Sequence, residues 1–253
     1  MTPISVVIIT LNEEKNIERC LLSVLDIADE IVVLDSLSTD RTKEICLKYH
    51  VRFIEQPFLG YTQQKNKALE FSKYQHVLSI DADEAISDEL KTSIKKVKEN
   101  WKSDGYYFNR LTNYCGKWIK HTDWYPDRKL RLFDKTKGEW TGQFIHESLT
   151  LQPNSSQSFL KGDLLHYSFP TIIHHLEVIQ NFSTLSAEEK HSNGIKANWL
   201  TVIFHPTLKF FKSYFIKLGF LDGFYGFVIS VMVAFDTFMK YVKLHELNRK
   251  DLS

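Results

Sequence analysis

The stretch "VLSIDADE" at residues 77–84 joins an apolar run to three carboxylates, Asp81, Asp83 and Glu84. Its first residues are typical of a strand that is buried on both faces of a sheet. Unpaired carboxylates this close together repel one another, so the segment needs a positive charge beside it. The sequence therefore places an acidic cluster, with a missing cation, at the end of a buried strand.

Working outward from this stretch, strand and helix patterns alternate through the first hundred residues. Apolar and β-branched runs predict strands, and 3.6-residue periodicity with capping residues predicts helices. The predicted strands cover 4–10, 30–35, 51–56 and 76–81, and the predicted helices cover 12–28, 38–49, 61–73 and 87–100. This alternation predicts an α/β fold with a mostly parallel sheet and right-handed crossovers.

Capping residues mark the starts of two of these helices. Asn12 is the expected N-cap of the first helix, followed by acidic residues that suit a first turn. Ser87 is the expected N-cap of the fourth helix, with Asp88 and Glu89 in its first turn.

The rest of the chain changes character twice. Residues 101–168 contain short strand-like pieces rich in aromatic residues, which indicates an antiparallel continuation of the sheet together with substrate loops. From about residue 170 the pattern is helical. We therefore expect a catalytic domain over 1–168 and a helical region over 169–253.

Composition narrows the classes of function. The formal net charge is +1, so overall charge does not favour a nucleic-acid partner. The three cysteines are far apart and form no CxxC pair, which argues against zinc ribbons, thioredoxin chemistry and a disulfide framework. The N-terminus has no basic region before its short apolar run, so we expect no signal peptide. We expect a cytoplasmic location instead.

Three polar clusters follow predicted strand ends. Ligands of open α/β sheets sit at the carboxyl ends of the strands, so these clusters should meet along one edge. The clusters are Thr10-Leu11-Asn12-Glu13, Asp35-Ser36-Leu37-Ser38-Thr39-Asp40 and Asp81-Ala82-Asp83-Glu84.

The Asp81-x-Asp83 pair has three explanations. It can be a helix-capping turn, because Asp favours caps and turns. It can bind a hard metal ion, because Mg²⁺ or Mn²⁺ prefers carboxylate and phosphate oxygens. A glycosidase-like acid/base pair needs two carboxyl groups across a cleft, and these two residues are too close in sequence. No glycine-rich phosphate-binding motif is present, so a bound nucleotide would need a metal for its phosphates.

Three stretches together resemble a known family. "SVVIITLNEEKNIERCLLSV" (5–24), "IVVLDSLSTDRT" (31–42) and "VLSIDADE" (77–84) are similar to the signature stretches of family-2 inverting glycosyltransferases with the GT-A fold. The resemblance covers about residues 3–150, and the order of the three stretches makes it specific. One departure is Leu37, which stands where this family commonly has Gly.

The resemblance implies a donor site for a UDP-sugar with a Mg²⁺ or Mn²⁺ ion. It implies that Asp83 binds the metal directly and that Asp81 lies near the ribose or supports the metal. Asp35, together with Ser36, would hydrogen-bond the base, expected to be uracil. The turn containing Thr10, Asn12 and Glu13 would flank it.

An inverting transfer also needs a general base to take the proton of the acceptor hydroxyl. "GEWTGQFIHESL" (138–149) resembles a stretch of the lipopolysaccharide-core branch of the family and offers Glu147, next to His146. Asp127 is the second candidate for the base. Glu147 can instead be an edge-strand residue with no catalytic role.

Three further residues are candidates for the donor site. Arg128 and Arg131 suit a diphosphate or an acidic acceptor, or lie on a solvated edge strand. His166 is a candidate metal ligand, because a late His binds the metal in some GT-A enzymes, or it is structural.

The C-terminal stretch, 204–250, combines aromatic residues with lysines. Its longest uncharged span, 223–235, is shorter than the roughly 20 residues that a bilayer requires, so we expect no transmembrane helix. Two packed helices or a membrane-interface surface would both fit the pattern, and we favour peripheral association with the inner face of the cytoplasmic membrane.

"GFLDGFYG" (219–226) also resembles the tail of the lipopolysaccharide-core branch. The sequence therefore predicts a metal-dependent hexosyltransferase, resembling a β-1,4-glucosyltransferase, that moves glucose from a UDP-sugar to a lipopolysaccharide inner-core or other lipid-linked acceptor. A transferase acting on polyprenyl phosphate or protein, and a non-catalytic scaffold that binds nucleotide sugars, are the alternatives.

Overall fold

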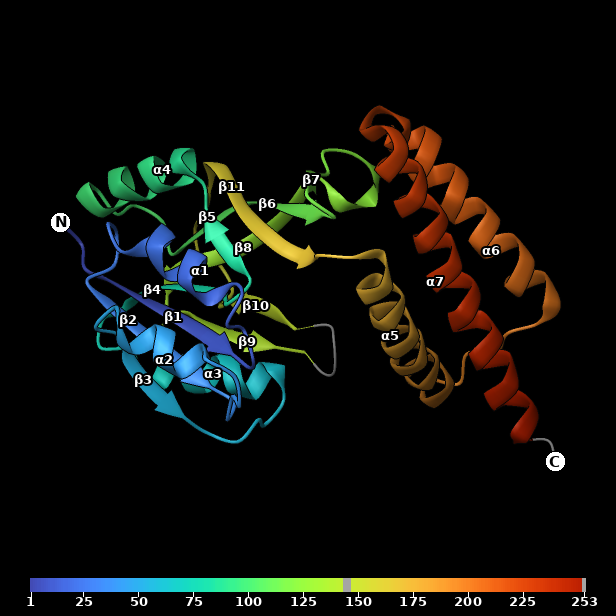
Figure 1. Cartoon of the computed structure of the whole chain (residues 1–253), viewed down its shortest axis with the longest axis horizontal. Helices are drawn as coiled ribbons and strands as arrows, with labels where there is room; N and C mark the ends of the chain where they lie inside the picture. The colour runs from blue at the N-terminus through green and yellow to red at the C-terminus, as the bar shows by residue number, and fades with distance from the viewer. Residues whose placement is uncertain (143–146, 252–253) are drawn as a thin grey trace. The chain divides into compact units, whose positions relative to one another are not determined.

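The computed structural model describes residues 1–142 and 147–251 (Figure 1). Contacts divide the chain into two compact units. The first unit contains residues 1–111 and 127–167, and the second contains 112–126 and 168–253. The expected division at residue 168 lies beside the second junction, but the segment 112–126 belongs with the C-terminal helices.

The first unit contains the predicted parallel strands in the order β3-β2-β1-β4. Helices α1 to α4 alternate with them along the chain (Figure 1). The elements are β1 (Ile4–Thr10), α1 (Ile17–Val24), β2 (Glu30–Asp35), α2 (Thr42–Leu47), β3 (Arg52–Glu55), α3 (Tyr61–Phe71), β4 (His76–Asp81) and α4 (Asp88–Glu99).

Antiparallel strands continue this sheet beyond β4 in the order β8-β6-β11-β5, and β9 pairs with β10 in a separate ribbon. Their bounds are β5 (Glu84–Ile86), β6 (Gly105–Tyr114), β8 (Asp127–Asp134), β9 (Gly138–Thr141), β10 (Ser148–Leu151) and β11 (Gln157–Phe169). The mixed sheet and the C-terminal helices confirm the predicted α/β fold.

The core explains why the apolar runs form central strands. On one face of the sheet, Ile4 and Ile8 of β1 pack in one cluster with Leu21 of α1 and Ile94 of α4. On the other face, apolar residues of β1, β2 and β4 pack with Ala68 of α3 and with residues of β8 and β9. Each fully buried Ile or Leu contributes roughly 1.5–3 kcal/mol through removal of its side chain from water. The sheet is therefore fixed on both faces, and its carboxyl edge is a rigid platform.

The helix starts are partly as predicted. The Ser87 hydroxyl accepts a hydrogen bond from the Leu90 N–H at 3.3 Å, which confirms the expected N-cap of α4. The prediction for Asn12 is wrong. Helix α1 begins at Ile17 with Asn16 at the N-cap position, and Asn12 has φ +54° in the preceding loop. Its side chain instead accepts a hydrogen bond from the Thr39 N–H in the loop after β2.

The second unit consists mainly of three helices, α5 (Ile172–Ser192), α6 (Trp199–Phe211) and α7 (Gly223–Lys250). Short elements complete it: β7 (Lys117–Trp118), η1 (Thr122–Trp124), the π-helical turn η2 (Lys212–Ile216) and the 3₁₀ turn η3 (Gly219–Asp222). Among the described residues, Gly219–Lys250 is the one helical stretch long and apolar enough to suit a membrane span. It contains an 18-residue window with a mean hydropathy of 1.4, a property that core helices of soluble proteins share. Such a window allows up to two charged residues, so it can include Asp222 and Asp236, whereas the prediction from the sequence counted uncharged residues only.

Candidate active site

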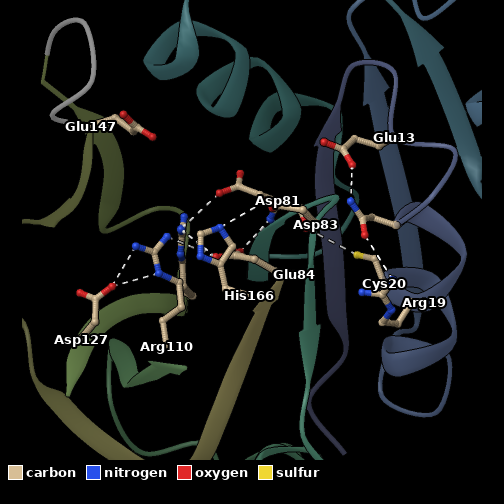
Figure 2. A network of polar contacts seen from close by, with 12 residues as sticks. Glu13, Arg19, Cys20, Asp81, Asp83, Glu84, Arg110, Asp127, Glu147 and His166 are labelled. Atoms are coloured by element: carbon tan, nitrogen blue, oxygen red, sulfur yellow. Dashed lines mark hydrogen bonds and ion pairs between the residues drawn. The ribbon is translucent and has the colours of Figure 1, made fainter. Parts of the chain in front are cut away.

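The acidic cluster lies where β4 ends and the chain turns directly into β5. Glu84 is buried, and its Oε2 accepts a hydrogen bond from the Asp81 N–H at 2.9 Å. On the neighbouring strand β11, His166 lies opposite Glu84 in register, and the Tyr167 N–H donates to the Asp83 carbonyl at 2.9 Å. Hydrogen bonds thus hold the turn from both sides, and Figure 2 shows the side chains of Asp81, Asp83, Glu84 and His166 around it.

Two buried protein cations supply much of the positive charge that the sequence stretch requires. Lys65 of α3 places its Nζ 3.0 Å from Asp81 Oδ1 and 3.4 Å from Glu147 Oε1. Arg131 of β8 lies 3.4 Å from Asp81 and 3.5 Å from Glu84. The cluster is therefore a buried ion network before any metal or donor enters it.

This network shifts the ionisation of its members. Burial alone would raise the pKa of Asp81, but Lys65 and Arg131 outweigh it and hold that pKa well below the ordinary range. For Arg131, burial lowers the pKa, while Glu84 and Asp81 raise it more, so the net pKa is raised. Both residues are therefore charged at neutral pH.

Trp140 of β9 forms an aromatic wall beside the two cations. Its ring centroid lies 4.4 Å from Lys65 Nζ and 4.8 Å from the Arg131 guanidinium carbon. Desolvated cation–π contacts of this kind stabilise by roughly 2 kcal/mol each. The indole helps to offset the cost of burying two positive charges.

Asp83 and His166 form the pair that fits a metal ion best. Asp83 Oδ2 lies 3.2 Å from His166 Nε2, and the Asp83 side chain is partly exposed (Figure 2). His166 Nδ1 is buried and has no hydrogen-bond partner among the described residues. Within residues 1–142 and 147–251, no group of three or more His, Cys, Asp or Glu side chains is arranged to hold a metal. An oxygen and a nitrogen donor fit Mg²⁺ or Mn²⁺ if other ligands, such as phosphate oxygens, complete the set.

Glu147 is brought to this cluster although it is far from Asp81 in sequence. Lys65 contacts both carboxylates, so one ammonium group separates the two. Burial, followed by Glu147, Asp81 and Asp83, raises the pKa of Tyr61 at the start of α3. The Tyr61 hydroxyl is therefore close enough to the same carboxylates for their charge to affect its pKa. His146, next to Glu147 in the sequence, lies outside the described residues.

Asp127, the second candidate base, is held more tightly. Arg110 of β6 contacts it through Nε at 3.0 Å and Nη2 at 2.9 Å, and Lys129 Nζ lies 3.1 Å away. Arg110 also lies 3.7 Å from Glu84. Asp127 is therefore the outer end of the same ion network, with two cations on its carboxylate.

The carboxyl ends of β1 and β2 form the second part of the site. Thr10 and Asp35 are direct partners in the parallel register. The buried Asp35 carboxylate accepts hydrogen bonds from the Ser38 N–H at 2.7 Å and from its hydroxyl at 2.5 Å. The Ser36 hydroxyl accepts a bond from Gln64 Nε2 at 3.1 Å. These predicted residues are thus adjacent.

The loops after β1 and β2 are tied to each other. Asn12 Oδ1 accepts a hydrogen bond from the Thr39 N–H at 2.8 Å, and the Asn12 N–H donates to the Ser38 hydroxyl. Leu37 has φ +66°, which is the left-handed region that favours glycine. The loop therefore keeps the conformation that the family's usual glycine permits, at some cost in backbone strain.

Glu13 faces the acidic cluster from the β1 side. Burial raises its pKa, the hydrogen bond from Asn16 Nδ2 at 2.8 Å lowers it, and Asp83, Asp40 and Asp81 raise it further. The net effect is a raised pKa. This electrostatic coupling links the first and third predicted clusters.

The two predicted arginines have different surroundings. Arg131 is buried in the ion network, whereas Arg128 is exposed, with its guanidinium 5.8 Å from the Tyr107 ring and 5.9 Å from the Phe159 ring. The structure thus brings Arg131, but not Arg128, into contact with the acidic cluster among the described residues.

Sequence reasoning missed Lys65 and Arg110. A signal for Lys65 existed, because it lies three and four residues before Ala68 and Leu69 on the buried face of α3. A lysine on an apolar helix face requires a buried anion. No comparable local signal identifies Arg110, whose partners come from β8 and β5.

With this geometry established, the comparisons define the class of protein. Residues 5–153 match the family model described as Glycosyl transferase family 2. The chain belongs to this family of glycosyltransferases.

Two relatives extend over nearly the whole chain. An uncharacterised glycosyltransferase of Rickettsia typhi is 32% identical over 262 residues, covering 99% of this chain and 89% of that protein. The lipopolysaccharide core biosynthesis glycosyltransferase LpsC of Rhizobium meliloti is 30% identical over 254 residues, covering 96% of this chain and 92% of that protein. The similarity therefore includes the C-terminal helices.

Among solved structures, glucosyl-3-phosphoglycerate synthase of Mycobacterium tuberculosis in complex with Mn²⁺ and UDP is 24% identical, with a TM-score of 0.37 and coverage of 44% of each chain.

Proposed function

We propose that this family-2 glycosyltransferase moves a hexose, with glucose as the first candidate, from a UDP-sugar to a lipopolysaccharide inner-core or other lipid-linked acceptor, with inversion. Family membership supports the transfer of a sugar. The lipid-linked acceptor is supported by the 30% identity to LpsC over 96% of the chain.

The donor would bind along the carboxyl edge of the parallel strands. Asp35, Ser36 and the turn from Thr10 to Glu13 offer polar groups for the nucleoside. Asp83 and His166, supported by Asp81, would hold Mg²⁺ or Mn²⁺. When bound, this ion would neutralise the negative charge that develops on the leaving diphosphate.

Arg131 would assist on the same side. It is buried, fixed by Asp81 and Glu84, and charged at neutral pH. A preorganised cation of this kind stabilises developing phosphate charge without having to reorganise during the reaction. Arg128, which is exposed, stays a candidate for contact with an acidic acceptor.

Glu147 would act as the general base. In a single displacement, the acceptor oxygen attacks the anomeric carbon from the face opposite the diphosphate and gives its proton to the base. Glu147 contacts one cation at 3.4 Å, whereas the Asp127 carboxylate is held by Arg110 and Lys129. A carboxylate with fewer engaged oxygens is the better proton acceptor, so we favour Glu147.

One observation carries the proposal: Lys65 contacts both Asp81 and Glu147. A third carboxylate, separate from the Asp81-x-Asp83 pair and within one ammonium group of it, is what an inverting transferase needs and what a capping turn does not need.

A lipid-linked acceptor implies that the enzyme works at the cytoplasmic face of the inner membrane as a peripheral protein. The apolar C-terminal helices support this location. Transfer to polyprenyl phosphate or to protein would use the same donor site and differ only in the acceptor. A non-catalytic scaffold would bind the donor without turnover.

The first experiment is a thermal-shift measurement of UDP binding with and without Mn²⁺. Ligand at 100 times its dissociation constant adds roughly 2.7 kcal/mol of stability. We expect stabilisation of the wild type in the presence of Mn²⁺ and its loss in Asp83→Ala. Asp88→Ala is the matched control, because Asp88 is exposed in the first turn of α4.

Stabilisation that needs both Mn²⁺ and Asp83 would support the donor site and justify assays of UDP-sugars with lipid-linked acceptors. The absence of any UDP effect, with or without metal, would refute the UDP-sugar proposal. Binding without turnover of any UDP-sugar would favour the scaffold.

A further inference from the structure

The segment from the end of α6 to the start of α7, residues 211–224, carries an unusual concentration of exposed apolar side chains. We call this segment the tip (Figure 1). Ile216 is 73% exposed and Phe224 is 70% exposed. The exposed apolar residues of the tip that matter here are Phe211, Phe215, Ile216, Phe220, Leu221 and Phe224. Contiguous apolar surface of this kind marks an interaction site.

Aromatic contacts hold three of these side chains, Phe211, Phe215 and Phe220, in place. The rings of Phe211 and Phe215 are stacked at 5.6 Å, and Tyr214 contacts Phe215 at 5.1 Å and Phe220 at 6.2 Å. The exposed rings are therefore part of a packed ladder.

The backbone of the tip is fixed as well. A Cβ on Gly226 would lie 1.8 Å from the Gly219 carbonyl oxygen, so only glycine permits η3 to pack against α7. The Thr122 N–H donates to the Lys217 carbonyl at 2.9 Å, and the hydroxyls of Ser213 and Ser230 lie 3.1 Å apart. The apolar surface is thus preformed and its exposure is built into the fold.

The exposed charged side chains of the tip are both lysines. Between residues 209 and 235, Asp222 is the single acidic residue of the sequence. It is buried, and its carboxylate accepts hydrogen bonds from the N–H groups of Lys120 and His121. Lys212 and Lys217 are exposed. The surface therefore combines apolar side chains with positive charge, which complements anionic lipid headgroups.

We propose that the tip is the membrane-docking element of this protein: its exposed apolar side chains enter the interfacial layer of an anionic bilayer while Lys212 and Lys217 contact the headgroups. The inference specifies the membrane partner implied by the proposed lipid-linked acceptor and rests on that function only for its biological setting.

The exposed apolar surface of the tip fits a membrane interface better than it fits a membrane span or a second copy of the chain. Gly219–Lys250 is long and apolar enough for a membrane span, but its longest uncharged part, 223–235, is about 20 Å long at 1.5 Å per residue, shorter than the hydrocarbon core of about 30 Å. Lys243, further along α7, is bonded to the Gln180 carbonyl and the Ser183 hydroxyl of α5. A second copy of the chain would bring an equally basic surface against the lysines.

The test is co-sedimentation of the full-length protein with vesicles of phosphatidylcholine alone or with added phosphatidylglycerol. We expect the wild type to bind the anionic vesicles and to be released by high salt. K212Q/K217Q should bind them about 25-fold more weakly, because each lysine near an anionic surface contributes a factor of about five. I216S/F224S should lose affinity by a factor on the order of ten or more.

The matched control is L22S/L47S, which removes two exposed leucines of α1 and α2 in the first unit. It should bind vesicles like the wild type. Circular dichroism and UDP thermal shifts of each variant show whether it is folded. The vesicle assay contains neither donor nor acceptor, so failure of the proposed transferase activity would not alter its result.

Three outcomes would overturn the inference. One is the absence of wild-type binding to anionic vesicles. Another is unchanged binding by I216S/F224S. A third is wild-type self-association, measured by analytical ultracentrifugation, that the same substitutions abolish while vesicle binding persists.

Discussion

Lys65 and Arg131 of the first unit are 2% and 4% exposed, whereas Ile216 and Phe224 of the second unit are 73% and 70% exposed. Each unit thus carries side chains opposite to the usual preference, with charges inside one and apolar groups outside the other. In the first unit the buried cations are matched by Asp81, Glu84 and Glu147. In the second unit the exposed apolar groups of the tip have no such partner among the described residues.

This contrast between buried charges and exposed apolar groups indicates how each unit interacts with other molecules. Buried, paired charges are expensive to build and gain little stability over apolar packing, so their presence indicates a chemical task. Exposed aromatic side chains indicate a surface task. This difference supports the proposed donor site in the first unit and the proposed membrane contact in the second.

The largest effect should come from removing the proposed base. Glu147→Gln should lower kcat by about 10²–10⁴-fold, because the amide cannot take the acceptor proton, while UDP binding is retained. Asp127→Asn is the comparison, and we expect a smaller loss. Steady-state kinetics with the active UDP-sugar measure both variants. A larger loss in Asp127→Asn would move the role of base to Asp127.

Breaking the buried ion network should destabilise the first unit. Lys65→Met leaves Asp81 and Glu147 without a shared cation and should lower the free energy of unfolding by about 3–4 kcal/mol. The estimate is at the lower end because Asp81 is partly exposed and keeps Arg131. Urea unfolding measures the change.

Lys67→Met on the same helix is the control for this change. Lys67 pairs with Glu70 at the surface, so its loss should change stability by less than about 1 kcal/mol. Equal effects of the two substitutions would contradict the idea that burial gives the Lys65 network its importance.

A drop in pH should destabilise the second unit through His175. Burial, and to a lesser extent His174, lowers the pKa of His175 from 6.5 to about 4 in the second unit, where its Nδ1 lies 3.0 Å from the Tyr114 hydroxyl. The unfolded chain therefore binds the proton first. The stability contribution of His175 is complete above about pH 6.5 and falls by about 2–3 kcal/mol as the pH drops toward 4.

Asp81 behaves differently. Because its pKa is lowered in the folded protein, its contribution to stability is complete above its unfolded pKa of 3.8 and is lost only below that pH. Urea unfolding at about pH 7 and about pH 4.5 should show a loss in the wild type that His175→Phe reduces, the remainder including His76, whose pKa burial also lowers. An unchanged pH dependence in His175→Phe would exclude His175 as its source.

The smallest effect concerns Leu37, an exposed apolar residue of the first unit that owes its strain to the backbone. Leu37→Gly should raise stability by up to about 1 kcal/mol, because relief of the left-handed conformation exceeds the entropy cost of glycine. Leu22→Gly, within α1, should lower stability by about 1 kcal/mol. Thermal unfolding compares the two, and a loss in Leu37→Gly would show that the side chain packs usefully.

Much of the fold was predictable because its signals are local. The β-branched runs of β1, β2 and β4 announce central strands, and the capping residue Ser87 marks α4. Asn12 was misread because a good capping side chain also serves a loop, and in this protein it bonds to Thr39 across a gap of 27 residues. Local propensity cannot choose between the two uses.

By itself, the sequence determined the α/β alternation, the family signature stretches and the acidic residues that follow the strand ends. Only the tertiary structure decided that Lys65 neutralises Asp81 and reaches Glu147, that Arg131 turns inward, and that Asp222 is buried while Lys212 and Lys217 stay exposed. The reason is physical. Strand and helix periodicity acts over a few residues, whereas the partner of a buried charge is set by which distant segments the packed sheet brings within about 4 Å.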